Sequence, residues 1–334
     1  MTRTRPQDLH LAIVGVGGQQ ASEFIGLYAR SRPEIVAVDI DDVARQRVSS
    51  LGYRTFASIS ELLSNEIVDA AYIAVPHQDH AEIAAKFLEH GVTVLEEKPF
   101  AVRSEEADVL MNLSDRAQTP VFTTAQRPFR HTSLQLQGSL RRLGEIYSYS
   151  YTYSLSLPVR TTGWRSTWAA ARGGVMLDMA YHQLDLVSLL LGPQSVDAAQ
   201  VSYCYDETRS ERLEDSSTIL TSTLDGRCAG QITTNRHAHA KSEQLTLYGT
   251  EAVAVMSASQ LRIYNRDGSL QWTVDETGGA QATVRAMYQE YLANRNNPGY
   301  WIPHMARHRH VVACLEQAYA LVSLPENVKE AHYV

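Results

Sequence analysis

Four short apolar runs alternate with stretches of helical periodicity in the first third of this 334-residue chain. They read LAIVGVG, EIVAVDI, VDAAYIAVP and GVTVLEEKP. Continuous apolar runs of this length, such as residues 11–14 and 70–75, are typical of strands that helices cover on both faces. The alternation therefore predicts βαβ units and a Rossmann-type, doubly wound parallel sheet.

After about Gln126 the pattern changes to longer alternating segments, separated by the turn sequences LDGR and NRDGS. Alternation with a period of two predicts an open, largely antiparallel sheet. A helix is expected at 173–192, and another closes the chain at 308–322. The chain exceeds the size of one ordinary core, so we expect two domains. The first domain is expected to cover 1–125 and the second 126–334.

Composition excludes several classes of function. Charged residues make up 20% of the chain and the net charge is -7, so the basic excess of nucleic-acid-binding proteins is missing. The three cysteines are widely spaced and odd in number, which predicts reduced thiols in a cytoplasmic protein and no metal site. The N-terminal stretch MTRTRPQDLH has no apolar core of a leader, and no apolar run predicts a membrane span.

A glycine turn follows the first predicted strand. In a G-x-G-x-x-G turn the first two glycines, here Gly15 and Gly17, let the backbone approach a pyrophosphate at a helix N-terminus. Gln20 stands at the third position, where glycine mainly permits close packing of helix on strand. Taken alone, the turn is equally compatible with an ordinary strand-turn-helix connection. As a cofactor site, it would be lined by Gly15, Gly17, Gly18, Gln19 and Gln20.

An acidic residue supports the cofactor interpretation. Asp39 lies 24 residues after Gly15, at the end of the second predicted strand. Dinucleotide folds place an acid there to accept hydrogen bonds from the ribose hydroxyls. The sequence leaves open whether Asp39 or Asp41 takes this place. Because no Arg or Lys follows within DIDDVA and the acid would repel a 2′-phosphate, we expect NAD as cofactor, with NADP less favoured.

A second motif lies at residues 74–102, AVPHQDHAEIAAKFLEHGVTVLEEKPFAV. Its VP pair, then His80, and then the EKP triplet at the end of a strand resemble the Gfo/Idh/MocA family, named for glucose-fructose oxidoreductase, inositol dehydrogenase and MocA. The resemblance implies a set of cofactor-binding residues, namely Val75, Pro76, His80, Glu97 and Lys98.

A third motif, GGVMLDMAYHQLD at 173–185, is similar to the D-x-x-x-H-x-x-D helix of the same family. Together, the motifs imply a nicotinamide-dependent oxidoreductase that acts on a sugar, a cyclitol or a related polyol. The resemblance places Lys98 beside the nicotinamide, in contact with the reacting oxygen. It assigns the acid–base role to His182 and places Asp178 next to it.

The chemistry of these side chains is compatible with those roles. Asp178, His182 and Asp185 are spaced i, i+4 and i+7 on an otherwise apolar helix, so we expect them to face a cleft; a solvated polar stripe is the alternative. Hydride transfer to or from an alcohol carbon requires proton exchange at its oxygen, for which an imidazole is suited. The ammonium of Lys98 can stabilise alkoxide charge.

Other candidates come from predicted loops. Arg127, Trp164 and Arg165 lie where the two-domain layout would bring them near the site, so we expect them to bind substrate together with Lys98, Asp178 and His182. His77 and His80 lack the partners of a metal site.

Two further patterns receive structural interpretations. His304 and His308 are expected to form a surface pair. The alternating tyrosines of residues 147–153 are expected to pack in a sheet or at a dimer surface, and not to bind substrate.

The favoured function is a dehydrogenase or ketoreductase acting on CH–OH groups of a carbohydrate or cyclitol. One alternative is an NAD-using glycosidase without net redox change, and another is a non-catalytic sugar or cofactor sensor. Joint retention of Lys98, Asp178 and His182 disfavours the sensor. A one-sided sheet has a face to cover, which predicts a homodimer or homotetramer.

Overall fold

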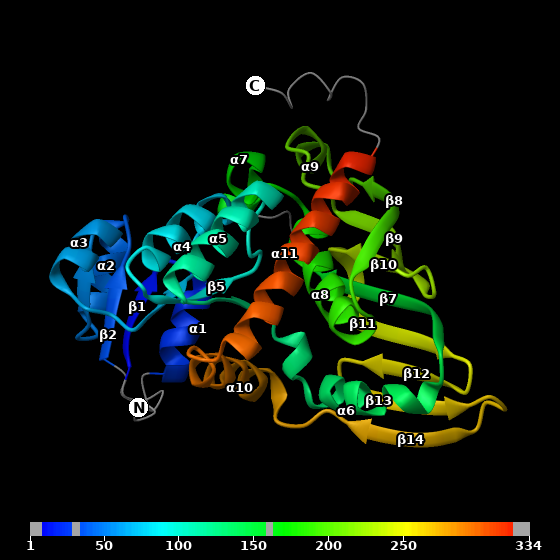
Figure 1. Cartoon of the computed structure of the whole chain (residues 1–334). Helices are drawn as coiled ribbons and strands as arrows, with labels where there is room; N and C mark the ends of the chain where they lie inside the picture. Colours follow the sequence, from blue (N-terminus) through cyan, green and yellow to red (C-terminus); the bar gives the residue numbers. More distant parts are fainter. Residues whose placement is uncertain (1–8, 29–33, 158–162, 323–334) are drawn as a thin grey trace. The chain divides into compact units, whose positions relative to one another are not determined.

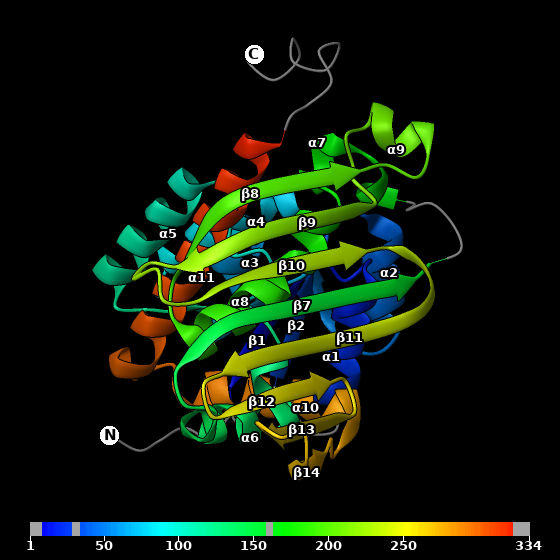
Figure 2. The same cartoon turned by 90° about the vertical axis from the view of Figure 1, so that its right-hand side faces the viewer.

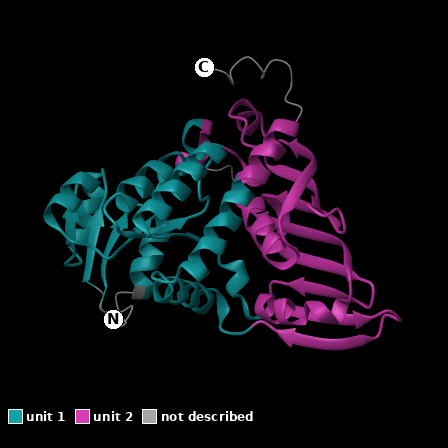
Figure 3. Cartoon of the chain, viewed as in Figure 1, with its two compact units in different colours: residues 1–131, 169–172, 277–312 teal, residues 132–168, 173–276, 313–334 magenta. Residues whose placement is uncertain are grey.

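The computed structural model describes residues 9–28, 34–157 and 163–322 (Figure 1). The chain forms two compact units (Figure 3). Unit 1 comprises residues 1–131, 169–172 and 277–312, and unit 2 comprises 132–168, 173–276 and 313–334. The expected domains 1–125 and 126–334 stay a prediction, because compactness alone does not define a folding domain. The N-terminal stretch expected to lack a leader falls largely on residues 1–8, outside the described residues.

Unit 1 contains a six-stranded parallel sheet in the order β3-β2-β1-β4-β5-β6, the Rossmann order. Its strands are β1 (His10–Val14), β2 (Glu34–Val38), β3 (Arg54–Phe56), β4 (Ala70–Ile73), β5 (Thr93–Glu97) and β6 (Val121–Thr124). Its helices are α1 (Gln19–Tyr28), α2 (Asp42–Ser49), α3 (Ile59–Asn65), η2 (His77–Asp79), α4 (His80–Leu88), α5 (Ser104–Ala117), η3 (Arg127–Phe129), α10 (Gly279–Ala293) and the first part of α11 (Pro298–Leu321). The apolar residues of β1 and β4 are buried on both faces, which confirms the predicted parallel sheet.

Unit 2 contains an eight-stranded sheet in the order β14-β13-β12-β11-β7-β10-β9-β8. Its strands are β7 (Ile146–Ser156), β8 (Gln194–Ser202), β9 (Ser216–Thr223), β10 (Ala229–Asn235), β11 (His237–Gly249), β12 (Ala252–Ser257), β13 (Gln260–Asn265) and β14 (Leu270–Asp275). Its helices are α6 (His131–Ser139), η4 (Leu140–Leu143), η5 (Gly163–Ser166), α7 (Trp168–Ala171, ending in unit 1), η6 (Met176–Ala180), α8 (Tyr181–Leu191) and α9 (Asp206–Ser210). All neighbouring strands are antiparallel except β7 and β10, so the predicted fold class is confirmed.

The face of this sheet turned toward the viewer in Figure 2 carries no helix among the described residues of unit 2, whereas α8 lies behind it. Tyr149 and Tyr151 of β7 are buried, and the Gln183 side chain of α8 donates to the Tyr151 carbonyl at 3.0 Å. Tyr149 and Tyr151 therefore pack within the unit, whereas Tyr147 of the same strand is 53% exposed.

The predicted single helix at 173–192 begins with a wider turn. Residues 176–180 form a π-helical turn, η6, and α8 continues from Tyr181 until Gly192 ends it at a φ of +91°. A π turn changes the rotation per residue, so residues before and after it no longer share one face. Asp178 and His182 remain partly exposed, but Asp185 is fully buried. The expectation that all three face a cleft is therefore wrong for Asp185.

The turn η6 is anchored by Glu214. Its backbone carbonyl accepts from the Val175 amide at 3.0 Å, and its carboxylate accepts from the Met176 amide at 2.8 Å. A Cβ atom on Gly174 would lie 2.3 Å from the Glu214 carbonyl oxygen. Gly174 thus permits the close approach of the Glu214 backbone, and Gly173 permits that of the Tyr319 hydroxyl, which lies 2.3 Å from where its Cβ atom would be.

His304 and His308 are not a surface pair. Both rings are buried in α11, with centroids 4.3 Å apart. His304 Nε2 accepts from the Thr123 amide at 3.1 Å, and burial lowers the pKa of His308 well below its ordinary value. The surface interpretation was wrong because it used the spacing of the two residues alone, whereas their burial results from packing of α11 against distant segments.

Candidate functional site

The glycine turn lies at the carboxyl end of β1, between β2 and β4. Gly15 has a φ of +85°, and a Cβ atom there would lie 2.4 Å from the Ala74 carbonyl oxygen. Its amide donates to the Val38 carbonyl at 2.9 Å. Only glycine combines this backbone conformation with such a close approach. The turn leads into α1 at Gln19, so the first helical amides and the helix dipole form a site suited to a phosphate anion.

Asp39 faces this turn. Its Oδ2 accepts from the Gly17 amide at 2.8 Å, and its Oδ1 accepts from the Asp41 amide at 2.9 Å. The carboxylate of Asp41 instead caps α2 by accepting from the Val43 amide at 2.9 Å. Of the two acids left open by the sequence, Asp39 is therefore the one directed to the glycine turn.

Two arginines, Arg45 and Arg47, follow shortly after the DIDDVA segment. Arg45 donates to the Asp39 carbonyl at 2.7 Å and pairs with Asp42 at 2.7 Å. Arg47 donates to the Val16 carbonyl at 2.7 Å. Both guanidinium groups thus bind protein oxygens beside the turn.

His80 connects two other predicted cofactor segments. Its side chain is fully buried, with Nε2 3.0 Å from the Val75 carbonyl oxygen and Nδ1 3.0 Å from the Pro99 carbonyl oxygen. Pro76 precedes the short helix η2 in between. His80 therefore contacts backbone, and it holds the segment after β4 against the segment after β5, where Lys98 lies.

Glu97 and Lys98 leave the carboxyl end of β5, and both are partly exposed. Glu97 Oε1 accepts from the Tyr72 hydroxyl at 2.6 Å, and the Tyr288 hydroxyl donates to Tyr72 at 3.3 Å. Burial, and then the Glu97 charge, raise the pKa of Tyr72 well above its ordinary value. Tyr72 and Tyr288 thus support the EKP segment. Sequence analysis missed both, although a hydroxyl inside an apolar strand was a signal for Tyr72.

The ends of the parallel strands bring one set of predicted residues together. Gly15, Asp39, Val75 and Lys98 follow β1, β2, β4 and β5, and the carboxyl ends of these strands lie at one edge of the sheet. In open parallel sheets this edge binds ligands where the strand order reverses, which is here between β1 and β4. Arg127 also belongs to unit 1, but it is buried in η3 with 2% of its surface exposed.

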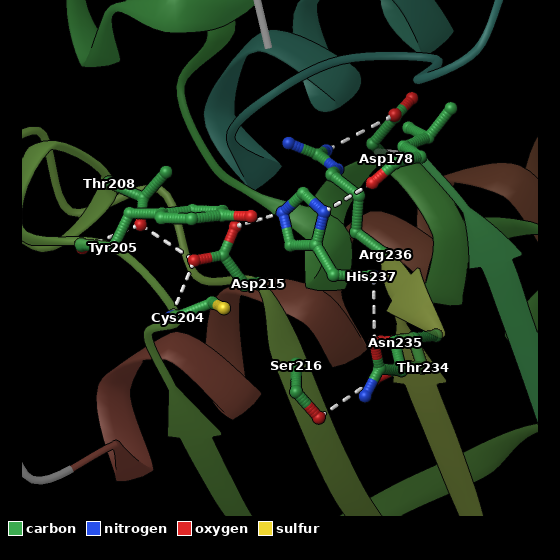
Figure 4. A network of polar contacts seen from close by, with 11 residues as sticks. Asp178, Cys204, Tyr205, Thr208, Asp215, Ser216, Thr234, Asn235, Arg236 and His237 are labelled. Carbon is green, nitrogen blue, oxygen red and sulfur yellow. Dashed lines mark hydrogen bonds and ion pairs between the residues drawn. The ribbon is translucent and has the colours of Figure 1, made fainter. Parts of the chain in front are cut away.

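The other predicted residues belong to unit 2. Asp178 and His182 lie in η6 and α8, and Trp164 and Arg165 lie in η5, where the Arg165 guanidinium is 4.2 Å from the centre of the Trp164 ring. Arg236 Nη2 lies 3.6 Å from Asp178 Oδ2 (Figure 4). No local pattern in the sequence indicated Arg236.

Within the described residues, no cluster of three or more His, Cys, Asp or Glu side chains is arranged to hold a metal ion. The helices of the same residues include none long and apolar enough to cross a membrane. The three cysteines are free thiols, in agreement with their spacing.

The buried position of His80 predicts a pH-dependent stability. Burial, and then the Lys98 charge, lower the pKa of His80, so the unfolded chain takes up a proton more readily than the folded one. The neutral His80 ring therefore contributes fully to the stability of the fold above the ordinary histidine pKa of about 6.5, and this contribution is lost as the pH falls below that value. The free energy of unfolding is measured with denaturant at about pH 7 and about pH 5.5. Its decrease between the two pH values should be smaller for His80→Gln than for wild type, by up to ~1.4 kcal/mol per pH unit.

His90→Gln, at an exposed histidine two residues after the end of α4, is the matched control and should follow wild type. Equal pH dependence in wild type and His80→Gln would contradict the prediction.

Two family models match the chain. One, described as an oxidoreductase family with an NAD-binding Rossmann fold, matches residues 9–124. The other, the GFO/IDH/MocA C-terminal domain, matches residues 140–255. Together they match more than half of the 334 residues.

Individual relatives agree with the models. A protein of Amycolatopsis mediterranei, provisionally assigned as a UDP-kanosamine synthase oxidoreductase subunit, is 33% identical over 186 residues, which cover 54% of this chain and 51% of that protein. The chain thus spans about half the length of this relative. An uncharacterized oxidoreductase of Synechocystis is 28% identical over 280 residues, with 78% and 75% covered.

Among solved structures, levoglucosan dehydrogenase in complex with NADH and levoglucosan has the same fold, with a TM-score of 0.82, 17% identity, and 94% of this chain and 96% of that chain covered. The order of the parallel strands, the glycine turn with its acid and the matches to both family models lead to one assignment: the chain belongs to the Gfo/Idh/MocA family of oxidoreductases with an NAD-binding Rossmann domain.

Proposed function

We propose that this protein transfers a hydride between a nicotinamide cofactor and a CH–OH or keto group of a sugar, cyclitol or related polyol. The observation that carries the proposal is the edge of the parallel sheet in unit 1, where Gly15, Asp39 and Lys98 lie at the ends of neighbouring strands. The substrate class is supported by the names of the relatives, which include a UDP-sugar enzyme subunit and a dehydrogenase bound to levoglucosan.

The residues of unit 1 fit a dinucleotide. Gly15 adopts a conformation that leaves no room for a side chain, α1 begins directly after the turn, and the Asp39 carboxylate lies beside it. The turn would hold the pyrophosphate and Asp39 the ribose hydroxyls. Val75, Pro76, His80, Glu97 and the neighbouring Gln19 and Gln20 complete the proposed cofactor-binding set. A bound nicotinamide supplies or accepts the hydride.

Three residues carry the proposed proton chemistry. Lys98 donates to the reacting oxygen and stabilises its negative charge as the hydride leaves the carbon. His182 accepts the hydroxyl proton in oxidation and returns it in reduction. Asp178, one turn before His182, orients its ring and stabilises its cationic form. Arg127, Trp164 and Arg165 are the further proposed substrate contacts.

A preference for NAD is the first prediction from this site. Asp39 would repel the 2′-phosphate of NADP, and Arg45 and Arg47 already bind protein oxygens. Wild type should show the higher kcat/KM with NAD, and Asp39→Ser should reduce the difference. Asp115→Ser, an exposed acid on α5, is the control. Equal or better kcat/KM of wild type with NADP would refute the preference.

The second prediction tests the reaction and its residues together. Inositols, aldoses, their keto forms and anhydrosugars are incubated with oxidised or reduced cofactor. A dehydrogenase changes the absorbance of reduced nicotinamide in proportion to turnover. An NAD-using glycosidase converts the compound without this absorbance change, and a sensor converts neither the compound nor the cofactor. With the best compound, His182→Ala should lower kcat by roughly 10²-fold or more and alter the pH profile near neutrality.

Lys98→Met should also lower kcat severely, but the part of the pH profile near neutrality that reports His182 should remain. Cofactor binding, followed by fluorescence, should hardly change in His182→Ala. Exposed residues provide the controls His239→Ala and Lys86→Met. If His182→Ala keeps near-normal turnover and profile, the acid–base role passes to Lys98. Tyr181, which precedes His182 and also carries an ionisable hydroxyl, is fully buried.

The third prediction concerns assembly. In the register of the eight-stranded sheet the uncharged residues Thr246, Ser150, Gln231 and Leu220 lie next to one another on neighbouring strands, at positions that alternate with the buried Tyr149 and Tyr151, and Leu220 is 44% exposed. Depletion of charge is typical of the centre of an interface. We therefore expect a homodimer or homotetramer through this face, and Leu220→Lys should weaken it. Light scattering that reports a monomer of 37.2 kDa at micromolar concentration would exclude the assembly.

A further inference from the structure

Arg236 is a buried cation next to the candidate acid–base residues. It is the single residue between β10 and β11, and 3% of its surface is exposed. Its Nη2 lies 3.6 Å from Asp178 Oδ2 (Figure 4). Removing a guanidinium from water is costly unless an anion and hydrogen-bond acceptors compensate. This ion pair is therefore fixed in a way that an exposed pair is not.

The backbone of Arg236 is held on both sides. Its amide donates to the Asp215 carbonyl at 3.0 Å, and its carbonyl accepts from the Leu157 amide at 3.1 Å. These contacts tie the β10–β11 junction to the segment before β9 and to the end of β7. The backbone position from which the Arg236 side chain extends is thus fixed by hydrogen bonds to two other segments of unit 2.

The next residue, His237, strengthens the same junction. Its ring lies between the Leu157 carbonyl oxygen, 2.7 Å from Nδ1, and Asp215 Oδ1, 3.2 Å from Nε2. The other oxygen of Asp215 accepts from the Cys204 amide at 2.7 Å and from the Thr208 hydroxyl at 2.6 Å (Figure 4). His237 and Asp215 are both nearly buried, so this network is protected from water.

Different polar groups surround η6 on its other sides. Glu214 binds the Met176 amide, and the Tyr319 hydroxyl of α11 accepts from the Leu177 amide at 3.2 Å and donates to Glu214 at 2.8 Å. These two side chains bind the backbone of the turn. From the sheet, the Arg236 guanidinium meets the Asp178 carboxylate, and along the helix the next titratable side chains are the buried Tyr181 and the partly exposed His182.

We infer that Arg236 is a positioning residue: it holds the Asp178 carboxylate ionised and in one orientation, and so determines how Asp178 supports proton exchange at His182. The inference rests on the proposed function for the roles of Asp178 and His182. The contact itself belongs to unit 2 and can be tested without substrate. A cation within about 4–6 Å favours the charged form of a carboxyl group, so its removal should make protonation of Asp178 easier.

The substrate-free test uses protein labelled with carboxyl-¹³C aspartate, with the Asp178 resonance identified by its loss in Asp178→Asn. In Arg236→Met the titration midpoint of this carbon should rise by about one pH unit or more. In Arg236→Lys, which keeps the charge, it should return most of the way to wild type. The control Arg262→Met removes an exposed arginine from β13 of the same unit and should leave the midpoint unchanged.

The kinetic test uses a compound that wild type oxidises. The acidic limb of the kcat/KM profile, which reports His182, should move upward in Arg236→Met because a nearby cation that opposes protonation of the ring is lost, and kcat/KM measured on this limb should fall about tenfold for each unit of that movement. The KM for the cofactor should stay constant, and Arg236→Lys should recover most of the activity. Arg236→Gln replaces the methionine variant if circular dichroism shows that the latter does not fold.

An unchanged midpoint of Asp178 in a folded variant without the Arg236 charge would overturn the inference and leave Arg236 a purely structural role. Failure of the proposed function is recognised separately. In that case wild type would oxidise none of the compounds, or Asp178→Asn and His182→Ala would keep its full activity, whereas the Asp178 midpoint would still report whether Arg236 acts on the carboxylate.

Discussion

The parallel pairing of β1 with both β2 and β4 is the constraint on which the candidate cofactor site depends. In this arrangement the chain leaves β1 between two neighbours, with the Gly15 amide bound to the end of β2 and the Ala74 carbonyl after β4 against the Gly15 α-carbon. The glycine turn is therefore held from both sides, and α1 begins at one defined point. Because the strands are parallel, Asp39 and Lys98 arrive at the same edge although 58 residues separate them. Strand order thus determines which strand ends lie side by side, and the residues at those ends provide the functional groups of the candidate cofactor site.

In unit 2 a buried carboxylate has a comparable role for the candidate acid–base residues. Glu214 binds the start of η6 with its backbone and its side chain and also accepts from Tyr319. Burial raises the pKa of Glu214, and these hydrogen bonds partly oppose that effect. On the sheet side, Arg236 meets Asp178. The π turn thus lies between the Glu214 carboxyl group, which binds its backbone, and the Arg236 cation, which pairs with its Asp178 carboxylate. Single π turns of this kind are often found at functional sites.

Much of the fold followed from local patterns. Continuous apolar runs predicted the parallel strands, period-two alternation predicted the antiparallel sheet, and glycine-containing turns separated its strands. The glycine turn was weak evidence by itself, and the acid at Asp39 together with the EKP segment made the cofactor interpretation specific. Roles implied by the family resemblance remain proposals for Lys98, His182 and Asp178. For His80 the structure adds its two carbonyl contacts, so the residue supports the site through the backbone.

The sequence by itself determined the strand and helix order, the glycine that the turn requires, and the acid that follows β2, because each of these depends on a few neighbouring residues. Tertiary structure decided which acid faces the turn, since Asp41 is used to cap α2. It also decided the burial of Asp185, His304 and His308, and the pairing of Arg236 with Asp178. The burial of His304 and His308 and the Arg236–Asp178 pair depend on contacts between segments about 60 to 180 residues apart, and the burial of Asp185 follows from a π-helical turn. Neither leaves a periodic signal in the chain, because the energy that selects them comes from packing and desolvation in the folded state.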